Sequence, residues 1–172
     1  MIEPLLLYWI GENEMKNLSQ KIQYDGKEYN LLFDLIAMEE IQNEYGDINK
    51  WVDLTDGEAY ARKEFEEKYD SLDLKEFYKG KRIPKTRPDW SELSKEQQAQ
   101  FSHIPDIGAL IFGYTCMINE GIDLENEEKG TNRPFLTKRQ VGRLLTGIGL
   151  EDAAKTMNQV FIDSTKGEEK NE

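Results

Sequence analysis

The sequence is poor in the residues that most often carry chemistry, with one cysteine, Cys116, and one histidine, His103, among 172 residues. A lone cysteine excludes an intrachain disulfide framework and a cysteine metal site, and it favours a reducing, cytosolic setting. A lone histidine excludes a histidine metal cluster or a catalytic histidine pair within one chain. No nucleophile motif such as G-x-S-x-G accompanies His103, so an acid or base role is the weaker interpretation of it. We therefore expect no enzyme activity, no metal and no cofactor.

Apolar residues are also scarce, at 38% of the chain against 33% charged residues, so part of the chain should be an exposed, charged insertion or tail. The apolar start, MIEPLLLYWI, is too short to span a bilayer and lacks the basic region and cleavage site of a signal peptide. The 22 basic and 34 acidic residues give a net charge of −12. This charge argues against binding to nucleic acid or to an anionic membrane, since both are polyanions. It would suit a protein that binds basic partner segments.

The stretch from Tyr29 to Leu54 carries the clearest pattern. Upstream of it, Asp25-Gly26 lies between two short alternating runs, which predicts a β-hairpin over residues 20–32. An amphipathic helix over 33–45 should follow, with a short turn or second helix over 48–54. Gly46 is placed to end the first helix, because glycine adopts the left-handed conformation cheaply. The predicted apolar stripe comprises Leu32, Leu35, Met38, Ile41 or Gln42, Tyr45 and Ile48.

The middle of the chain predicts short helices. Thr55–Glu58 has the spacing of a capping box and predicts a helix over about 57–69. The apolar residues between 72 and 78 indicate a further short helix. Two more capping boxes, Asp89–Glu92 and Ser94–Gln97, precede a predicted helix in the run EQQAQF.

Between these helices, Lys79–Arg87 holds five basic residues and no acidic residue. With Pro84 inside it and Pro88 just after it, this run is expected to be an extended loop. It is either a solvated surface loop or a contact arm for an acidic surface. That surface could be this protein's own acidic face on another subunit.

The most apolar helix is expected to open at His103–Asp106 and to run from Ile107 to Ile118, with Gly121 ending it. A helix that is apolar nearly all round belongs in the centre of a fold. Its small residues, among them Ala109 and Gly113, would allow a neighbour to approach closely.

Residues 119–134 are acidic and are predicted to form a loop. The alternating acids Asp123, Glu125 and Glu127 resemble a calcium loop. Glu128 and Pro134, however, stand where such a loop needs a glycine and a bidentate acid. A solvated acidic loop is therefore the better interpretation.

A final capping box, Thr137–Gln140, predicts a helix that ends at the glycines 147 and 149, and a last helix then runs to about residue 163. This pair could be a DNA-binding helix-turn-helix, but its second helix offers only Lys155 against two acids, so two core helices are favoured. We predict a mainly helical fold, loosely α+β, with a short N-terminal β-hairpin. Residues 1–17 form an arm or leader, 18–163 a single domain with an insertion at about 56–103, and 164–172 a disordered tail.

The run "YNLLFDLIAMEEIQNEYGDINKW" after the hairpin resembles the tail assembly chaperones of long-tailed phages and prophages. Members of that family open with a short strand pair followed by a phrase of the form F-D-x-x-A-x-x-x-I-x-x-x-[FY]-G. In this chain the phrase comprises Phe33, Asp34, Ala37, Ile41, Tyr45 and Gly46. The later apolar helix, Ile107 to Ile118, and the acidic stretch after it are also of the kind found in that family. The resemblance covers residues 18–54 and 104–163, and neither the residues at 56–103 nor the first 14 belong to it.

The resemblance implies a non-enzymatic function, in which the protein coats the tape measure protein, keeps it soluble and helps to recruit tail tube subunits. It also implies self-association and a place in the host cytoplasm, with the protein absent from the mature virion. Many members are also made in a longer, frameshifted form. The residues expected to bind protein are Met38, Ile41, Tyr45, Trp51 and Tyr114, since those elements are apolar and have little else to bury them. The alternative is an acidic phage-encoded regulator or inhibitor that binds a basic host protein.

Overall fold

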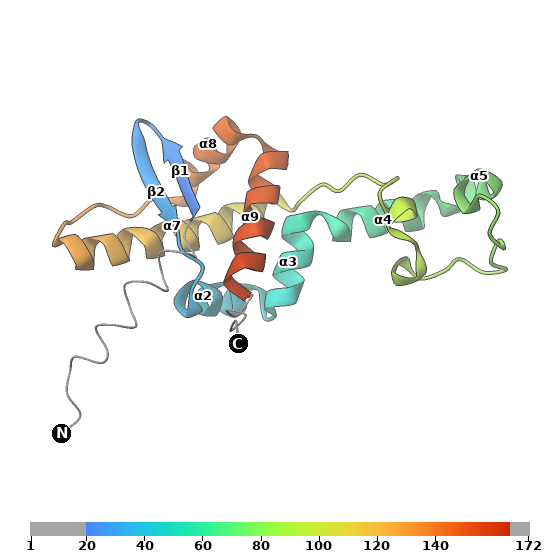
Figure 1. The fold of residues 1–172 in the computed structure, drawn as a ribbon, viewed down its shortest axis with the longest axis horizontal. Helices are drawn as coiled ribbons and strands as arrows, with labels where there is room; N and C mark the ends of the chain where they lie inside the picture. Colours follow the sequence, from blue (N-terminus) through green and yellow to red (C-terminus); the bar gives the residue numbers. More distant parts are fainter. Residues whose placement is uncertain (1–19, 166–172) are drawn as a thin grey trace, which may run out of the picture.

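The computed structural model describes residues 20–165, and the predicted N-terminal arm at 1–17 and the tail from 166 onward lie outside this range. The described chain is mainly helical with an N-terminal two-stranded antiparallel hairpin, which confirms the predicted fold class (Figure 1). Its elements, with their bounds, are β1 (Gln20–Tyr24), β2 (Lys27–Leu31), α2 (Leu35–Tyr45), α3 (Ile48–Asp56), α4 (Glu58–Lys68), η2 (Tyr69–Ser71), α5 (Leu74–Tyr78), η3 (Trp90–Glu92), α6 (Lys95–Gln98), α7 (Ile107–Lys129), α8 (Lys138–Ile148) and α9 (Leu150–Thr165).

The hairpin turns at Asp25-Gly26, as the sequence predicts. Both residues have positive φ, 51° and 70°, which is the backbone twist that joins two antiparallel strands through a two-residue turn. The register pairs Ile22 with Tyr29, and both side chains are buried on the face that packs against the rest of the protein. The hairpin thus contributes one apolar face to the core.

Helix α7 lies at the centre of the larger part of the molecule, with the hairpin and α2, α3, α8 and α9 around it (Figure 1). Trp51 of α3 is fully buried, and its indole Nε1 donates a hydrogen bond to the backbone oxygen of Ala109, 3.0 Å away. The hydroxyl of Tyr114 donates to the backbone oxygen of Ala153 in α9 at 2.8 Å. These two bonds satisfy polar groups that would otherwise be costly to bury.

Helix α7 does not end at Gly121, and the predicted acidic loop at 119–134 is helical as far as Lys129. Gly121 is needed for another reason. A Cβ atom there would lie 2.3 Å from the backbone oxygen of Asn30, so glycine lets strand β2 pass close to the helix. Gly130, with φ of 61°, ends the helix instead. The calcium-loop alternative therefore fails, because Asp123 and its acidic neighbours lie on a helix.

Helix α2 ends where predicted, but it begins at Leu35 and not at residue 33, because Asp34 caps it. The carboxylate of Asp34 accepts hydrogen bonds from the backbone N–H groups of Ile36 and Ala37, both at 3.0 Å. Gly46 has φ of 78° and closes the helix after Tyr45. The capping box at Ser94–Gln97 is confirmed, although the helix after it is only the four-residue α6.

The capping box predicted at Thr55–Glu58 is not present. Thr55 still belongs to α3, and its hydroxyl donates to the backbone oxygen of Val52. The carboxylate of Asp56 instead accepts a hydrogen bond from the backbone N–H of Glu58 at 2.7 Å. The reason is Gly57, whose left-handed conformation ends α3 one residue before α4 starts.

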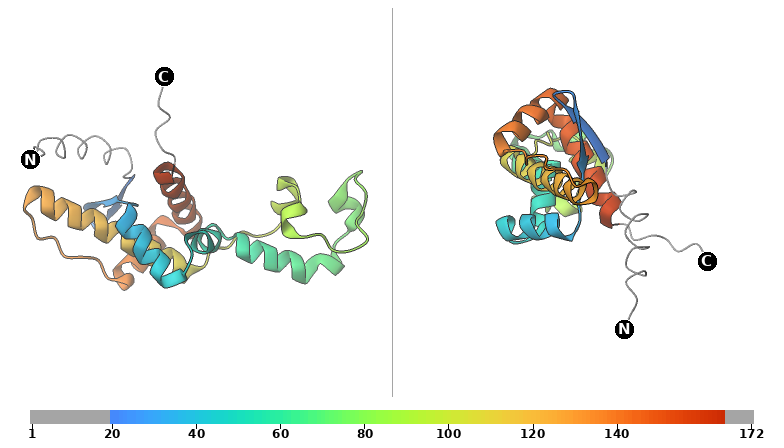
Figure 2. Two further views of the ribbon diagram at one scale, coloured as in Figure 1. Left: turned by 90° about the horizontal axis from the view of Figure 1, so that it is seen from below. Right: turned by 90° about the vertical axis from the view of Figure 1, so that its left-hand side faces the viewer.

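Residues 57–103 form an arm that projects from the remainder of the described chain, which we call the main body (residues 20–56 and 104–165; Figures 1 and 2). The arm has a core of its own, built around Phe65. The ring of Phe65 lies within 5.3 to 6.3 Å of four other aromatic rings, measured between centroids. Burial of such large rings is the main stabilising contribution available to so short a segment. The buried residues of this second core are Ala61, Phe65, Tyr69, Phe77, Tyr78, Trp90, Leu93 and Phe101.

The two ends of the arm meet where it joins the main body. The backbone N–H of Asp106 donates to the backbone oxygen of Leu54 at 2.7 Å. Gly57 lies so close to the backbone of His103 that a Cβ atom there would be 2.5 Å from its carbonyl carbon. The chain therefore leaves and re-enters the main body at one place.

The C-terminal helices complete the main body. The capping box of Thr137 and Gln140 at the start of α8 is confirmed, and α8 and α9 are separated by Gly149. The side chain of Asn119 exchanges two hydrogen bonds with the backbone of Leu136, which ties the connection between α7 and α8 to α7. Helix α9 continues to Thr165, so the first two residues of the predicted disordered tail are helical.

The contact at Gly121 predicts a clear effect of one added methyl group. Gly121→Ala should destabilise the protein by ~1–3 kcal/mol, because the rigid backbone of β2 or α7 must move. Gly147→Ala is the matched control, since a Cβ atom there meets nothing within 4 Å, and the helix propensity of alanine should stabilise α8 by up to ~1 kcal/mol. Urea unfolding measures both changes. Equal stability of the two variants would contradict the close approach of β2 to α7.

Candidate protein-binding surface

The structure places the five predicted protein-binding residues in or against the core of the main body. Ile41, Trp51 and Tyr114 each have a relative exposure of 0%. Met38 and Tyr45 are partly buried and pack against the same core. The premise that little else could bury them therefore does not hold for the first three. On the folded surface a partner would meet only Met38 and Tyr45 of this set.

The exposed apolar residues of the same region lie at the start of α2. Leu35 is 80% exposed and Ile36 is 51% exposed, whereas Ala37 and Ile41 point into the core. The predicted stripe was wrong in placing Leu35 on the buried face. The sequence did hold a signal, because Ala37 and Ile41 are four residues apart and share one face of the helix, which leaves Leu35 and Ile36 on other faces.

The end of α9 lies beside this surface. Phe33, just before α2, contacts Phe161 of α9 edge-to-face, with ring centroids 5.6 Å apart. Ile162, the next residue of α9, is 41% exposed. Phe33 and Phe161 are in contact, and each is followed in the chain by exposed apolar residues. These are Leu35 and Ile36 after Phe33, and Ile162 after Phe161.

A group of carboxylates, which we call the carboxylate face, lies where α2 packs on α7. It comprises Asp34, Glu40, Glu120 and Asp123. Within residues 20–165, none of these four side chains forms an ion pair. Burial, together with the neighbouring carboxylates, raises the pKa of Glu120 to about 7. Among residues 20–165, negative charges are therefore held close together here with no ion pair to a cation.

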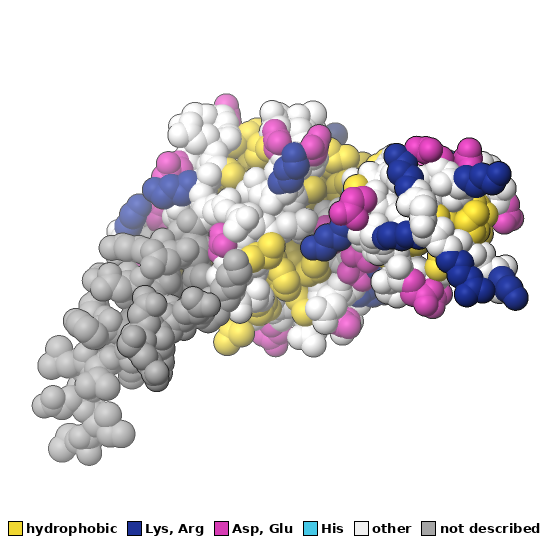
Figure 3. Space-filling model, turned by 45° about the vertical axis from the view of Figure 1, so that its right-hand side comes forward, with side chains coloured by type: hydrophobic (Ala, Val, Ile, Leu, Met, Phe, Trp, Pro, Cys, Tyr) yellow, Lys and Arg dark blue, Asp and Glu magenta, His cyan; other side chains and the backbone are white. Residues whose placement is uncertain are grey.

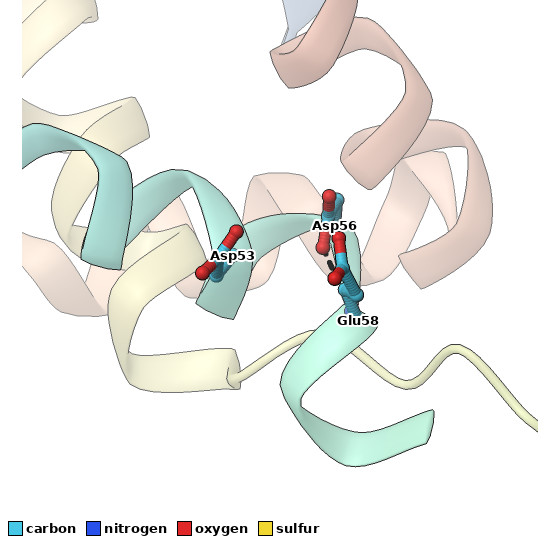
Figure 4. Close-up of side chains that lie close together, drawn as sticks. All are labelled: Asp53, Asp56 and Glu58. Carbon is cyan, nitrogen blue, oxygen red and sulfur yellow. Dashed lines mark hydrogen bonds between the residues drawn. The ribbon is translucent and has the colours of Figure 1, made fainter. Parts of the chain in front are cut away.

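A second acidic group, Asp53, Asp56 and Glu58, lies at the junction of α3 and α4 (Figure 4). Its carboxylate oxygens lie within 4.8 Å of one another. Arg62 pairs with Asp53 at 3.2 Å and with Glu58 at 3.3 Å. The carboxylate of Asp56 accepts a hydrogen bond from the backbone N–H of Glu58, and burial raises the pKa of Asp56. Each member thus has a structural partner at the junction between main body and arm.

The remaining candidates from the sequence lie on the arm or beside it. The basic loop Lys79–Arg87 follows α5 at the outer end of the arm, and its Lys and Arg residues are all exposed (Figure 3). His103 is also exposed, and its ring nitrogen Nδ1 lies 2.9 Å from the backbone oxygen of Phe101. No helix among residues 20–165 is long and apolar enough to cross a membrane.

Comparison with known protein families, with curated proteins and with solved structures finds no match to this chain.

The raised pKa of Glu120 predicts a pH-dependent effect of removing its charge. In the folded protein Glu120 holds its proton to higher pH than in the unfolded chain. Its contribution to stability is therefore present below the ordinary pKa of 4.5 and is lost as the pH rises through about 7. Glu120→Gln, which stays neutral, should gain stability over the wild type on going from pH 5 to pH 8.

Urea unfolding at the two pH values measures this difference. Glu66→Gln removes an exposed carboxylate from the arm and serves as the control for a change of one charge. If the two variants respond to pH in the same way, the pKa of Glu120 is not raised in the folded protein.

Proposed function

We propose that this protein is a non-enzymatic tail assembly chaperone of a long-tailed phage or prophage, which binds the tape measure protein and keeps it soluble. The observation that carries the proposal is the exposure of Leu35 and Ile36. Both lie within the F-D-x-x-A-x-x-x-I-x-x-x-[FY]-G phrase, and they are 80% and 51% exposed. The main body otherwise buries most of its large apolar side chains, so this pair is available to a partner.

A long helical partner suits such a surface. An amphipathic helix offers apolar side chains at three- and four-residue steps, which can pack on a small apolar patch. Asp34 and Glu40 lie on the same helix as Leu35 and Ile36 or next to it, and their charges would keep the complex in solution. In this proposal the protein also helps to recruit tail tube subunits, acts in the host cytoplasm and is absent from the mature virion.

The carboxylate face favours a second candidate, an acidic regulator or inhibitor that binds a basic host protein. Four carboxylates without an ion pair among the described residues would attract such a partner. They are interspersed with the apolar residues of α2, which suits a mixed surface better than a purely ionic one.

The two candidates differ in what the tagged protein captures from its own host after prophage induction, identified by mass spectrometry. A chaperone should capture the tape measure protein as its main partner. Capture of a basic host protein in its place would refute the chaperone proposal and support the inhibitor.

The exposed pair predicts which variant loses chaperone function. Leu35→Ser/Ile36→Ser should lower the soluble yield of the co-expressed tape measure protein severalfold, since loss of each buried aliphatic contact weakens binding by ~1–2 kcal/mol. Phe135→Ser, which changes a side chain that is 55% exposed between α7 and α8, is the matched control and should leave the yield unchanged.

Both variants alter exposed positions, so the fold should persist, and circular dichroism checks this. An unchanged yield with the Leu35→Ser/Ile36→Ser variant would show that the start of α2 is not the binding surface.

A further inference from the structure

The basic loop gathers positive charge at the outer end of the arm, although basic and acidic residues balance in the arm as a whole. Within residues 20–165, Lys79 pairs with Glu76 at 2.9 Å. The other basic residues of the loop make no ion pair in that range, and all are exposed, namely Lys81, Arg82, Lys85 and Arg87. Positive side chains on the outer end of the arm are visible in Figure 3. In a chain of net charge −12, such a concentration of unpaired cations is an exception.

The carboxylate face has the opposite character and belongs to the main body. Glu40 and Asp123 are exposed, while Asp34 and Glu120 are partly buried between α2 and α7. They are grouped where α2 packs on α7, and burial, followed by the other three carboxylates, raises the pKa of Glu120. A cation brought to this face would offset these negative charges.

The loop and the carboxylate face do not meet within one chain. The loop follows α5 at the outer end of the arm, whereas α2 and the middle of α7 lie in the main body (Figure 1). The second aromatic core fixes the path of the arm, since α4, α5 and the segment that returns to α7 all pack on Phe65 or its neighbours. The positive end of the arm is therefore held away from the negative face of its own main body.

We propose that the basic loop Lys79–Arg87 docks on the carboxylate face of a second copy of this chain. The second copy is the occupant because every molecule supplies both members of the complementary pair. The contact is head-to-tail, with different surfaces on the two sides, so it produces closed rings or open chains rather than a two-fold dimer. It does not depend on the chaperone function, because purified protein alone can form it.

The test reverses the charge on one surface at a time in the full chain. Arg82→Glu/Lys85→Glu changes the loop, and Glu40→Lys/Asp123→Lys changes the face, in each case at exposed positions. Sedimentation velocity should show association of the wild type that weakens with added salt, as screened charges require. Each reversed variant should associate at least ~10-fold more weakly than the wild type.

Mixing the two reversed variants provides the decisive measurement. The face variant keeps the intact basic loop and the loop variant keeps the intact carboxylate face, so the mixture should recover a loop–face contact that neither variant can form alone. Lys27→Glu/Lys50→Glu is the control, because it makes the same change in net charge at exposed lysines outside the loop, and it should associate like the wild type.

Three results would overturn the proposal. They are a wild type that stays monomeric at low salt, a loop variant that associates as strongly as the wild type, and a mixture that stays monomeric although both variants are folded. None of these results bears on capture of the tape measure protein, so failure here is separate from failure of the proposed function.

Discussion

The packing of Trp51 against α7 is the contact on which the rest of the structure depends. The ring occupies the space that a side chain at position 113 would need, since a Cβ atom on Gly113 would lie 2.3 Å from Trp51 Cζ2. Its indole N–H bonds the backbone of Ala109, and its face stacks on Phe33, with an angle of 12° between the ring planes. One side chain thereby connects the start of α2, the whole of α3 and the centre of α7. The direction of α3 in turn sets where α4 leaves the main body.

Local signals in the sequence predict much of this fold. The Asp25-Gly26 turn, the end of α2 at Gly46 and the caps at Ser94 and Thr137 depend on interactions between near neighbours in the chain, so they can be inferred from residue type and spacing. The close approach at Gly113 was also foreseeable, because small residues in an apolar helix permit it. These features can be predicted without knowing which elements pack together.

The errors arise where a distant segment decides the outcome. In the sequence Gly121 resembles a helix end, yet it lies inside α7. Glycine is needed at this position because the backbone of Asn30 passes beside it. Ile41, Trp51 and Tyr114 appeared available for a partner only because the elements that bury them are distant in sequence. Leu35 shows the converse error, since periodicity placed it inside while the cap at Asp34 and the packing of Ala37 turned it outward. Burial is a property of tertiary contacts, and single-sequence patterns report it only indirectly.

The aromatic core of the arm has a consequence for the charges that the chain displays. A basic run such as Lys79–Arg87 on an unpacked linker could fold back onto an acidic main body, and its charge would then be neutralised within the molecule. Here Phe65 and Phe101 pack the outgoing and returning segments together, and the contact of Gly57 with His103 holds both segments where they join the main body. The separation of the basic loop from the carboxylate face is therefore maintained by apolar packing, although the charges themselves would favour contact. Apolar burial in one segment thus determines which electrostatic contacts remain available between molecules.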